Sequence, residues 1–224
     1  MTLYGGSASR GNPARPAASA STGSDVRLRA RSITKKYGRQ QVLTGVDLTV
    51  RAGEVAAVVG ANGCGKSSFL RICAGLISPD TGRVWIDGTV GYCPQDGGTY
   101  EFLRPDEHFV LFGAGREWTR QRSRAAGRAA AAVLDWQVPA KTLGRHLSGG
   151  TRQKLNLILG GLGDPDVLLL DEPYQGFDHG SYVDFWRQVW RWRDGGSAVV
   201  VVTHLLNELD RVDLVLDLTP ADSR

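Results

Sequence analysis

The sequence predicts an α/β fold: a mostly parallel sheet, an antiparallel β subdomain and an inserted helical subdomain. Buried parallel strands are short runs of β-branched or aliphatic residues, and such runs lie near 54–59, 90–93, 166–170, 198–202 and 213–216. Residues 26–50 alternate apolar and polar positions, as antiparallel strands do, and GRVWIDGTV at 82–90 continues this β-rich part. The segment from about 97 to 147 is rich in alanine and arginine and is helical by propensity.

Composition places this chain of 224 residues, with a net charge of +4, among ordinary globular proteins. Residues 1–25 are rich in Gly, Ala, Ser and Pro, so we expect a disordered lead-in and no secretory signal, followed by one domain over 26–224. No apolar run approaches the ~20 residues that cross a bilayer. Three cysteines without a CxxC pair favour a reducing, cytoplasmic setting. The small charge indicates neither a nucleic-acid nor a lipid partner.

The first chemical motif is GANGCGKSS at 60–68, which follows the strand-like run EVAAVV and precedes the helix-like run FLRICAGL. Its glycines allow backbone N–H groups to approach phosphate oxygens, and the helix N-terminus favours an anion. Lys66 is expected to reach the β- and γ-phosphates, and Ser67 to coordinate Mg²⁺. The alternative is a glycine-rich turn with an incidental lysine, which the complete motif disfavours. The predicted nucleotide-binding residues here are Gly60, Asn62, Gly63, Cys64, Gly65, Lys66, Ser67 and Ser68.

Two adjacent acids follow an apolar run in DPDVLLLDEPYQGFD at 164–178. Parallel sheets place ligands at the C-terminal ends of their strands, so Asp171 is the candidate to hold Mg²⁺ through water. Glu172 is the candidate to orient or deprotonate the attacking water. Capping of a loop or helix is the alternative for this pair. His204 ends a further strand, where a histidine can donate to a γ-phosphate oxygen, although a lone histidine is usually structural.

A second anion-binding turn, LSGGTRQK at 147–154, opens another helix-like segment. The first loop already fills the phosphate-binding role for one nucleotide, so Ser148, Gly149 and Gly150 would be spare within a single chain. We therefore expect these residues to contact a nucleotide held by another copy. The economical arrangement is two chains packed head to tail, each closing the site of the other.

Further segments accompany these motifs: KKYG at 35–38, GYCPQD at 91–96, YQGFD at 174–178 and TH at 203–204. In this order the chain resembles the ATP-binding cassette (ABC) family over roughly residues 26–216. The family's names for the motifs are Walker A for GANGCGKSS, Q-loop for GYCPQD, signature for LSGGTRQK and Walker B for VLLLDEP. YQGFD occupies the D-loop, where the family commonly has Ser or Thr, then Ser, Gly, Leu and Asp.

The resemblance implies an ATPase that uses ATP and Mg²⁺ and works as an ATP-sandwich dimer, a homodimer or a heterodimer. It implies that Tyr37 stacks on adenine, that Asp178 keeps the D-loop role at the nucleotide, and that Gln95 senses γ-phosphate and metal. The implied catalytic residues are Lys66, Gln95, Glu172 and His204, and the implied metal-binding residues are Ser67, Gln95 and Asp171.

The first functional hypothesis is the ATPase subunit of a membrane transporter, completed by separate permease chains and bound to the inner face of the cell membrane. EFLRPDEHFVLFG at 101–113 is similar to the segment after the Q-loop in small-molecule exporters, so export ranks above import. The alternative is a soluble cassette ATPase in cofactor assembly, translation or a nucleic-acid process. Translation-type members usually carry two cassettes, so a nucleic-acid partner is not expected. The cargo is chosen by the permease.

Two side-chain rows remain. Arg116, Arg120, Arg124 and Arg128 recur every four residues in the insert, and like charges at this spacing disfavour a helix by ~0.2–0.5 kcal/mol per pair. An anionic partner is one interpretation of this row, and a solvated face is the more common one. Tyr182, Trp186 and Trp190 also recur every four residues, and we expect them to form one buried helix face on the sheet.

Overall fold

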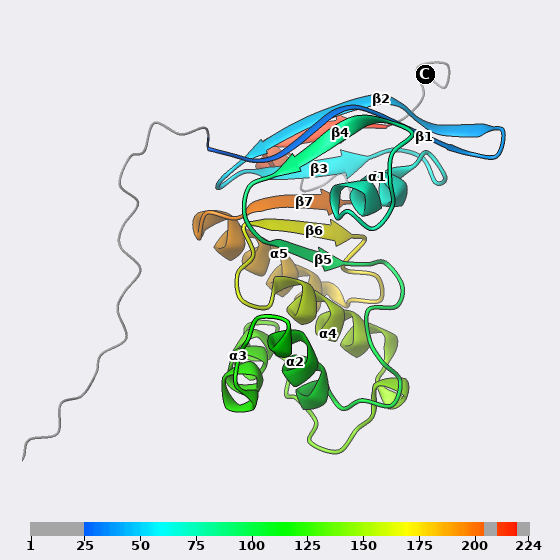
Figure 1. Cartoon of the computed structure of the whole chain (residues 1–224). Coiled ribbons are helices and arrows are strands. Elements are labelled where there is room, and N and C mark those ends of the chain that lie inside the picture. The colour runs from blue at the N-terminus through cyan, green and yellow to red at the C-terminus, as the bar shows by residue number, and fades with distance from the viewer. Residues whose placement is uncertain (1–24, 204–209, 219–224) are drawn as a thin grey trace, which may run out of the picture.

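The structure, a computed structural model, describes residues 25–203 and 210–218. Its centre is a five-stranded sheet in the order β5-β6-β7-β3-β8, in which all neighbouring strands are parallel (Figure 1). The strands are β3 (Val55–Val59), β5 (Val90–Cys93), β6 (Val167–Asp171), β7 (Ala198–Val202) and β8 (Leu214–Asp217). Each lies within one residue of a strand predicted from the sequence, so these predictions are confirmed.

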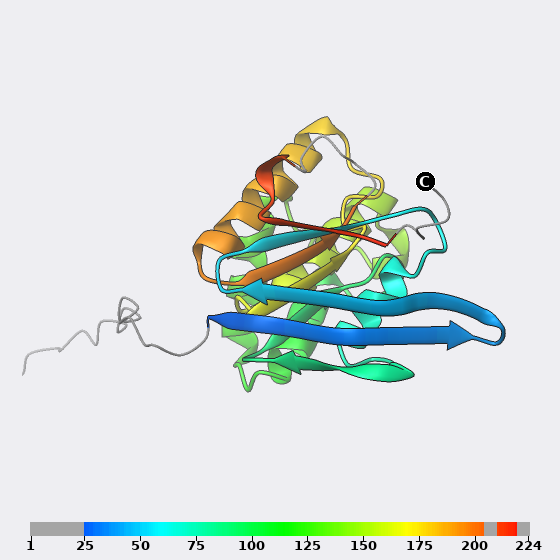
Figure 2. The same ribbon diagram turned by 90° about the horizontal axis from the view of Figure 1, so that it is seen from above.

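A second, antiparallel sheet has the order β2-β1-β4 (Figure 2). Its strands are β1 (Val26–Tyr37), β2 (Gln40–Arg51) and β4 (Thr81–Ile86), as the alternating patterns at 26–50 and 82–90 predict. A tight turn joins β1 to β2, and Gly38 supplies the positive φ of 61° that the turn requires. This sheet therefore confirms the antiparallel β subdomain.

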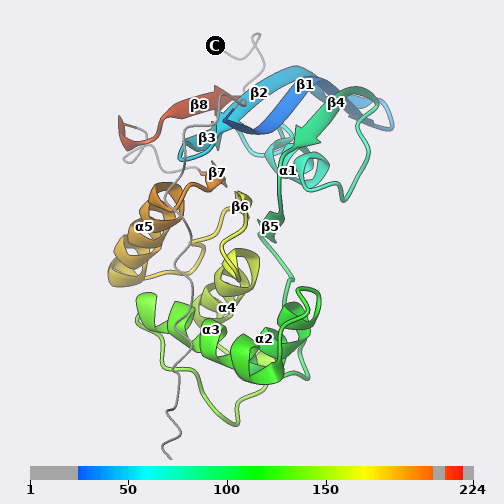
Figure 3. The ribbon, with the colours of Figure 1, turned by 60° about the vertical axis from the view of Figure 1, so that its left-hand side comes forward.

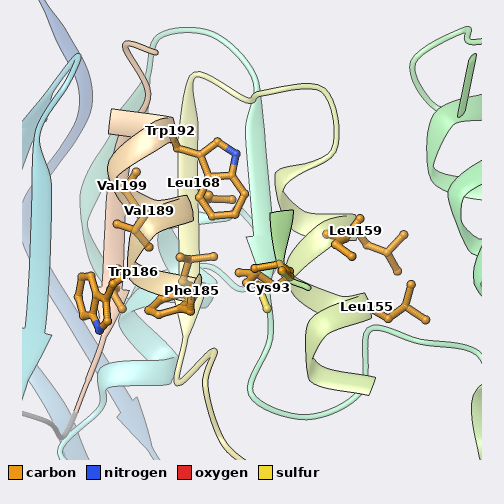
Figure 4. Packing of buried hydrophobic residues seen from close by; sticks show 14 of the residues in the cluster. Cys93, Leu155, Leu159, Leu168, Phe185, Trp186, Val189, Trp192 and Val199 are labelled. Carbon is orange, nitrogen blue, oxygen red and sulfur yellow. The ribbon is translucent and has the colours of Figure 1, made fainter. Parts of the chain in front are cut away.

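The parallel sheet separates two apolar cores, because successive side chains of a strand point to opposite faces. On one face, Leu168 of β6 and Val199 of β7 pack against the helices α4 (Gly149–Gly161) and α5 (His179–Asp194) (Figure 4). On the other face, Leu169 and Val200 pack against the helix α1 (Lys66–Cys73) and the antiparallel sheet. The all-apolar sequences of β6 and β7 thus serve two cores at once, which fixes these strands at the centre of the molecule.

The helices are α1 (Lys66–Cys73), α2 (Pro105–Ala114), α3 (Arg120–Val133), the short 3-10 helix η1 (Gly144–His146), α4 (Gly149–Gly161) and α5 (His179–Asp194). Helices α2 and α3 form a separate lobe below the sheets (Figure 3). They fall inside the segment 97–147 that the sequence predicts to be helical. The lobe is tightly packed, since a Cβ added to Gly127 of α3 would lie 2.2 Å from the ring of Phe109 on α2.

The aromatic row on α5 was predicted only in part. Trp186 is buried, but Tyr182 and Trp190 are half-buried at the edge of the core. The centre of the buried face is instead formed by Phe185, Val189 and Trp192 (Figure 4). The reason is geometric: a spacing of four residues advances 400° around a helix with 3.6 residues per turn, so such a row drifts off the sheet-facing side.

The arginine row in the insert is also corrected. Arg116 precedes α3, which begins at Arg120. Thr119 is the N-cap of this helix, and its hydroxyl accepts a hydrogen bond from the Arg122 backbone N–H. Arg128 forms an ion pair of 2.7 Å with Asp106 of α2. The four arginines therefore do not form one charged row along a helix. Arg120 and Arg124 are exposed to solvent, as the solvated-face interpretation predicts.

Candidate nucleotide-binding site

The predicted phosphate loop connects β3 to α1, in the strand–loop–helix order that the motif requires. Gly60, Gly63 and Gly65 all have positive φ, at 143°, 81° and 103°. Gly65 cannot be replaced without a clash, because a Cβ there would lie 2.6 Å from the carbonyl oxygen of Val42. Glycine is required here for two reasons: it adopts these angles without strain, and it leaves room for β2, which lies close to the loop.

Lys66 is the first residue of α1, and its side chain is only 5% exposed. Its Nζ donates hydrogen bonds to the carbonyl oxygens of Gly60 at 2.8 Å and Ala61 at 3.0 Å. The loop thus folds around its own ammonium group. A cation enclosed by a turn whose backbone N–H groups begin a helix is the arrangement that favours a bound phosphate chain.

Asp171 ends β6 and faces this loop. Its Oδ1 accepts a hydrogen bond of 3.1 Å from the Ser67 hydroxyl, whereas its Oδ2 is buried and has no hydrogen-bond partner within residues 25–203 and 210–218. Burial raises the pKa of the Asp171 carboxyl, the hydrogen bond from Ser67 opposes this, and the neighbouring Glu172 adds to it. A buried carboxylate oxygen without a donor, beside a hydroxyl, is a suitable place for a hard cation.

These residues fit Mg²⁺, which keeps several water and phosphate ligands and needs only one or two from the protein. Within residues 25–203 and 210–218, no group of three or more His, Cys, Asp or Glu side chains is arranged to hold a metal by itself. A cation here would therefore depend on phosphate oxygens and water to complete its shell. This is the ligand set expected when metal and nucleotide bind together.

Glu172 follows directly and adopts a left-handed backbone conformation, with φ of 47°. Its Oε2 accepts two hydrogen bonds, from Nε2 of Gln95 at 3.0 Å and from Nε2 of Gln175 at 2.7 Å. The predicted Q-loop residue and the predicted base are therefore in direct contact. Gln175 was noticed in the sequence only as a departure from the family's D-loop.

The phosphate loop, Glu172 and Gln95 of the Q-loop surround one hollow of about 660 Å³, and Asp171 lies behind Ser67, outside its lining. Half-exposed Tyr37 stands at its edge, with its hydroxyl 3.3 Å from the Ser68 Oγ. Sequence reasoning missed Gln40 and Val42 of β2, since neither belongs to a motif. The lining residues are Tyr37, Gln40, Val42, Asn62, Gly63, Gly65, Lys66, Ser67, Ser68, Gln95, Glu172 and Gln175.

The signature residues do not line this hollow. Ser148 is the N-cap of α4, and its Oγ accepts a hydrogen bond of 3.3 Å from the Thr151 backbone N–H. Asp178 is likewise the N-cap of α5, and its bond to the Ser181 backbone N–H lowers the pKa of the Asp178 carboxyl. Both residues therefore have structural roles within the chain. His204 lies outside the described residues.

A parallel sheet that carries a phosphate loop after one strand and an acid at the end of another defines a P-loop nucleotide-binding protein. The family model described as "ABC transporter" matches residues 43–175. The chain therefore belongs to the ABC transporter family, as an ATP-binding cassette domain. Among residues 25–203 and 210–218, no helix has the length and apolar character that a membrane span requires.

Three curated relatives illustrate the range of the family. The Daunorubicin resistance ATP-binding protein DrrA3 of Streptomyces coeruleorubidus is 30% identical, over 84% of this chain and 63% of its own length. The Nod factor export ATP-binding protein I of Azorhizobium caulinodans is 32% identical, over 82% and 61%. The Aliphatic sulfonates import ATP-binding protein SsuB 1 of Rhizobium johnstonii is 36% identical, over 83% and 71%. The chain thus spans less than two thirds of the first two.

Solved structures give the same fold. A bacterial ABC transporter cassette solved as a dimer superposes with a TM-score of 0.79 at 22% identity, covering 86% of this chain and 94% of that one. An ATP-binding subunit of an ABC transporter gives 0.78 at 24% identity, covering 85% of each chain. At these identities the likeness concerns the fold alone.

Cysteine labelling tests nucleotide binding without measuring turnover. Cys64, in the phosphate loop, is half-buried, whereas Cys73 and Cys93 are buried, and burial raises the pKa of the Cys73 thiol to about 12 and that of Cys93 as well. A maleimide should therefore modify Cys64 alone. If ATP binds to the loop as predicted and covers it, labelling should slow by more than about tenfold when ATP far exceeds its Kd.

Mass spectrometry of the labelled peptide provides the measurement, and Cys64→Ser provides the control that should not label. Equal labelling rates with and without saturating ATP would count against a nucleotide site in this loop.

Proposed function

We propose that the chain is the ATP-binding and ATP-hydrolysing subunit of an ABC membrane transporter, coupled to separate permease chains. The observation that carries this proposal is the hollow lined by the phosphate loop and Glu172, in which Gln95 is hydrogen-bonded to Glu172 and Ser67 to the buried Asp171. Family membership supplies the chemistry: ATP hydrolysis used to drive a change in a membrane partner. The subunit would lie in the cytoplasm, on the inner face of the cell membrane.

The nucleotide is held from two ends. The N–H groups of the phosphate loop and the Lys66 ammonium would face the triphosphate. Lys66 would then donate its hydrogen bonds to phosphate oxygens in place of the carbonyl oxygens of Gly60 and Ala61, which pairs a nearly buried positive charge with an anion. The exposed ring of Tyr37 offers a face for the adenine at the mouth of the hollow. Asn62, Gly63 and Ser68 complete the contacts with the phosphates.

Ser67, Asp171 and Gln95 would hold Mg²⁺ with the nucleotide, Asp171 through a water molecule. The cation supplies charge neutralisation of the β- and γ-phosphates. Ser67 and Asp171 are already within hydrogen-bond distance of one another, so little rearrangement of the protein is needed.

Glu172 is the proposed general base. It lies at the C-terminal end of β6 on the edge of the hollow, where its carboxylate can orient water toward the γ-phosphate and accept its proton. The strained backbone at Glu172 is consistent with a functional position, because such conformations persist only where the surroundings enforce them. His204, outside the described residues, keeps its predicted role toward the γ-phosphate.

The signature turn and Asp178 are proposed to serve the nucleotide of a second cassette, in a head-to-tail homodimer or heterodimer. Two observations support this. Ser148, Gly149 and Gly150 open α4 away from the lining of the chain's own hollow, and a Cβ placed on Gly149 would meet no atom of the described part of the chain within 4 Å. The turn is thus accessible to an anion carried by another chain.

A permease docking surface is proposed just after the Q-loop. Phe102 is 69% exposed and Tyr100 is 56% exposed, and the guanidinium of Arg145 lies 5.3 Å from the Phe102 ring centroid. Exposed aromatic side chains gathered beside an arginine are typical of protein interfaces. The position beside Gln95 would connect the permease to the hollow. The segment after the Q-loop favours a small-molecule exporter, and the relatives include resistance and export proteins as well as an import protein.

Substitution of the proposed base tests the enzymatic function. Glu172→Gln keeps the shape and hydrogen bonding of the side chain but removes its basicity, so turnover should fall by at least ~100-fold while ATP affinity stays near wild type. Phosphate release and fluorescent-nucleotide binding provide the two measurements. Unchanged turnover would remove Glu172 from this role.

Mixing of two variants tests whether sites are shared between chains. Lys66→Met disables the phosphate loop and Ser148→Arg disables the signature, so each variant alone should be inactive. In an equimolar mixture, half of the dimers contain one copy of each variant. Each of these dimers has one intact site out of two, so about one quarter of wild-type ATPase activity should return. No recovery, in a mixture shown to exchange subunits, would contradict a homodimer with shared sites.

Affinity purification from detergent-solubilised membranes tests the transporter assignment. The full chain should retain integral membrane proteins, and Phe102→Asp should lose most of them, since a central aromatic contact contributes about 2 kcal/mol to such an interface. Trp85→Asp is the matched control, because Trp85 is also half-exposed but lies on β4 of the antiparallel sheet. Retention of only soluble assembly factors would favour the soluble ATPase instead.

A further inference from the structure

We propose that Gln175 is a positioning residue, whose amide orients the Glu172 carboxylate together with Gln95. This inference rests on the proposed function, because it assigns Gln175 a task in the hydrolysis for which Glu172 is the base. It goes beyond the family resemblance, which gives the D-loop position of Gln175 no such contact.

The two amides hold the same oxygen of the carboxylate. Gln95, after β5, and Gln175, in the loop after β6, both donate to Oε2, at 3.0 and 2.7 Å. A carboxylate bonded through one oxygen to donors on two separate segments has little freedom to rotate. The direction in which Oε1 faces is thereby fixed, and a general base must hold such a direction to act on water.

The backbone of Glu172 requires this kind of support. Its φ of 47° is a conformation that a non-glycine residue adopts at an energetic cost. The turn that follows returns Gln175 toward it, with the Gln175 backbone N–H 3.4 Å from the Glu172 carbonyl oxygen. The side-chain bond and the turn therefore stabilise one another.

The loop that carries Gln175 is itself anchored on both sides. The Tyr174 ring packs edge-on against Tyr182 and Phe185 of α5, with centroids 5.4 and 5.5 Å apart, and its hydroxyl is hydrogen-bonded to Thr203. On the other side, the Gly176 carbonyl oxygen lies close to Gly150, since a Cβ added to Gly150 would be 2.7 Å from that oxygen. Gln175 thus extends from a fixed backbone, and its amide is oriented in advance.

The residue type is also informative. Serine is common at this position in the family, and its hydroxyl is shorter by several bonds than the glutamine amide. A long amide donor is needed to reach across the turn to the carboxylate, so the contact is a property of this chain's YQGFD segment.

Substitution of Gln175 tests the inference. Gln175→Met has a similar length but no donor, so kcat for ATP hydrolysis should fall by about tenfold while ATP affinity stays near wild type, because the proposed nucleotide contacts are made by the phosphate loop and Tyr37. Gln175→Ser, which the family tolerates, should give the same fall and serves as a second variant if the methionine protein unfolds. Gln121→Met, on the exposed side of α3, is the matched control and should hydrolyse ATP at the wild-type rate.

The decisive measurement is the same substitution in a Glu172→Gln background, by single-turnover hydrolysis. If Gln175 acts through the carboxylate, Gln175→Met should cause no further loss there, whereas general damage to the loop would lower both rates equally. Equal losses in both backgrounds, or a wild-type kcat for both Gln175 variants, would overturn the inference. Full activity of Glu172→Gln itself would instead overturn the proposed function, so the two failures are distinguishable.

Discussion

The rest of the structure depends on a carboxylate buried where β6 meets the phosphate loop. Asp171 is fully buried, and within residues 25–203 and 210–218 its side chain accepts a hydrogen bond from the Ser67 hydroxyl alone. A hydrogen bond to a charged group contributes about 1.5–3 kcal/mol net, whereas removing a carboxylate from water costs several kcal/mol. The hydroxyl alone does not offset that cost. The nearby cations Lys66 and Arg71 favour the charged form, yet burial still raises the pKa of the Asp171 carboxyl. The site is therefore prepared for a further cation.

This constraint explains the arrangement around it. β6 lies between β5 and β7, so the loops that follow these strands open on the same edge of the sheet. Gln95 reaches the hollow from the end of β5, and Glu172 from the end of β6. Gly65, just before α1, approaches the Val42 backbone of β2, and Ser67 in the first turn of α1 reaches the Asp171 carboxylate. Two apolar cores, one on each face of the sheet, hold this edge rigid.

The signature turn at Ser148 lies outside the hollow, yet it contacts a segment that lines the hollow. Gly150 of the signature packs against Gly176, in the loop that carries Gln175 and follows Glu172. If a partner chain's nucleotide binds at Ser148, the signature turn and the loop at Gly176 would connect it to this chain's own proposed base, Glu172. On the other side of the Q-loop, buried His108 bonds the Tyr100 backbone N–H through Nε2 and the Arg104 carbonyl oxygen through Nδ1, and burial lowers its pKa. This neutral ring fixes the exposed segment proposed to meet the permease.

The sequence by itself determined the strands of the parallel sheet, the phosphate loop and the family, because those signals are local: apolar runs, glycines at positive φ and acids at a strand end. It also placed Lys66, Ser67, Gln95 and Glu172 at one site, through motif order alone. Only the tertiary structure decided which α5 aromatics are buried, that Arg128 is neutralised by Asp106, and that Gln175 bonds Glu172. Each of these depends on the packing angle of a helix or the path of a turn, and contacts between segments distant in sequence set both.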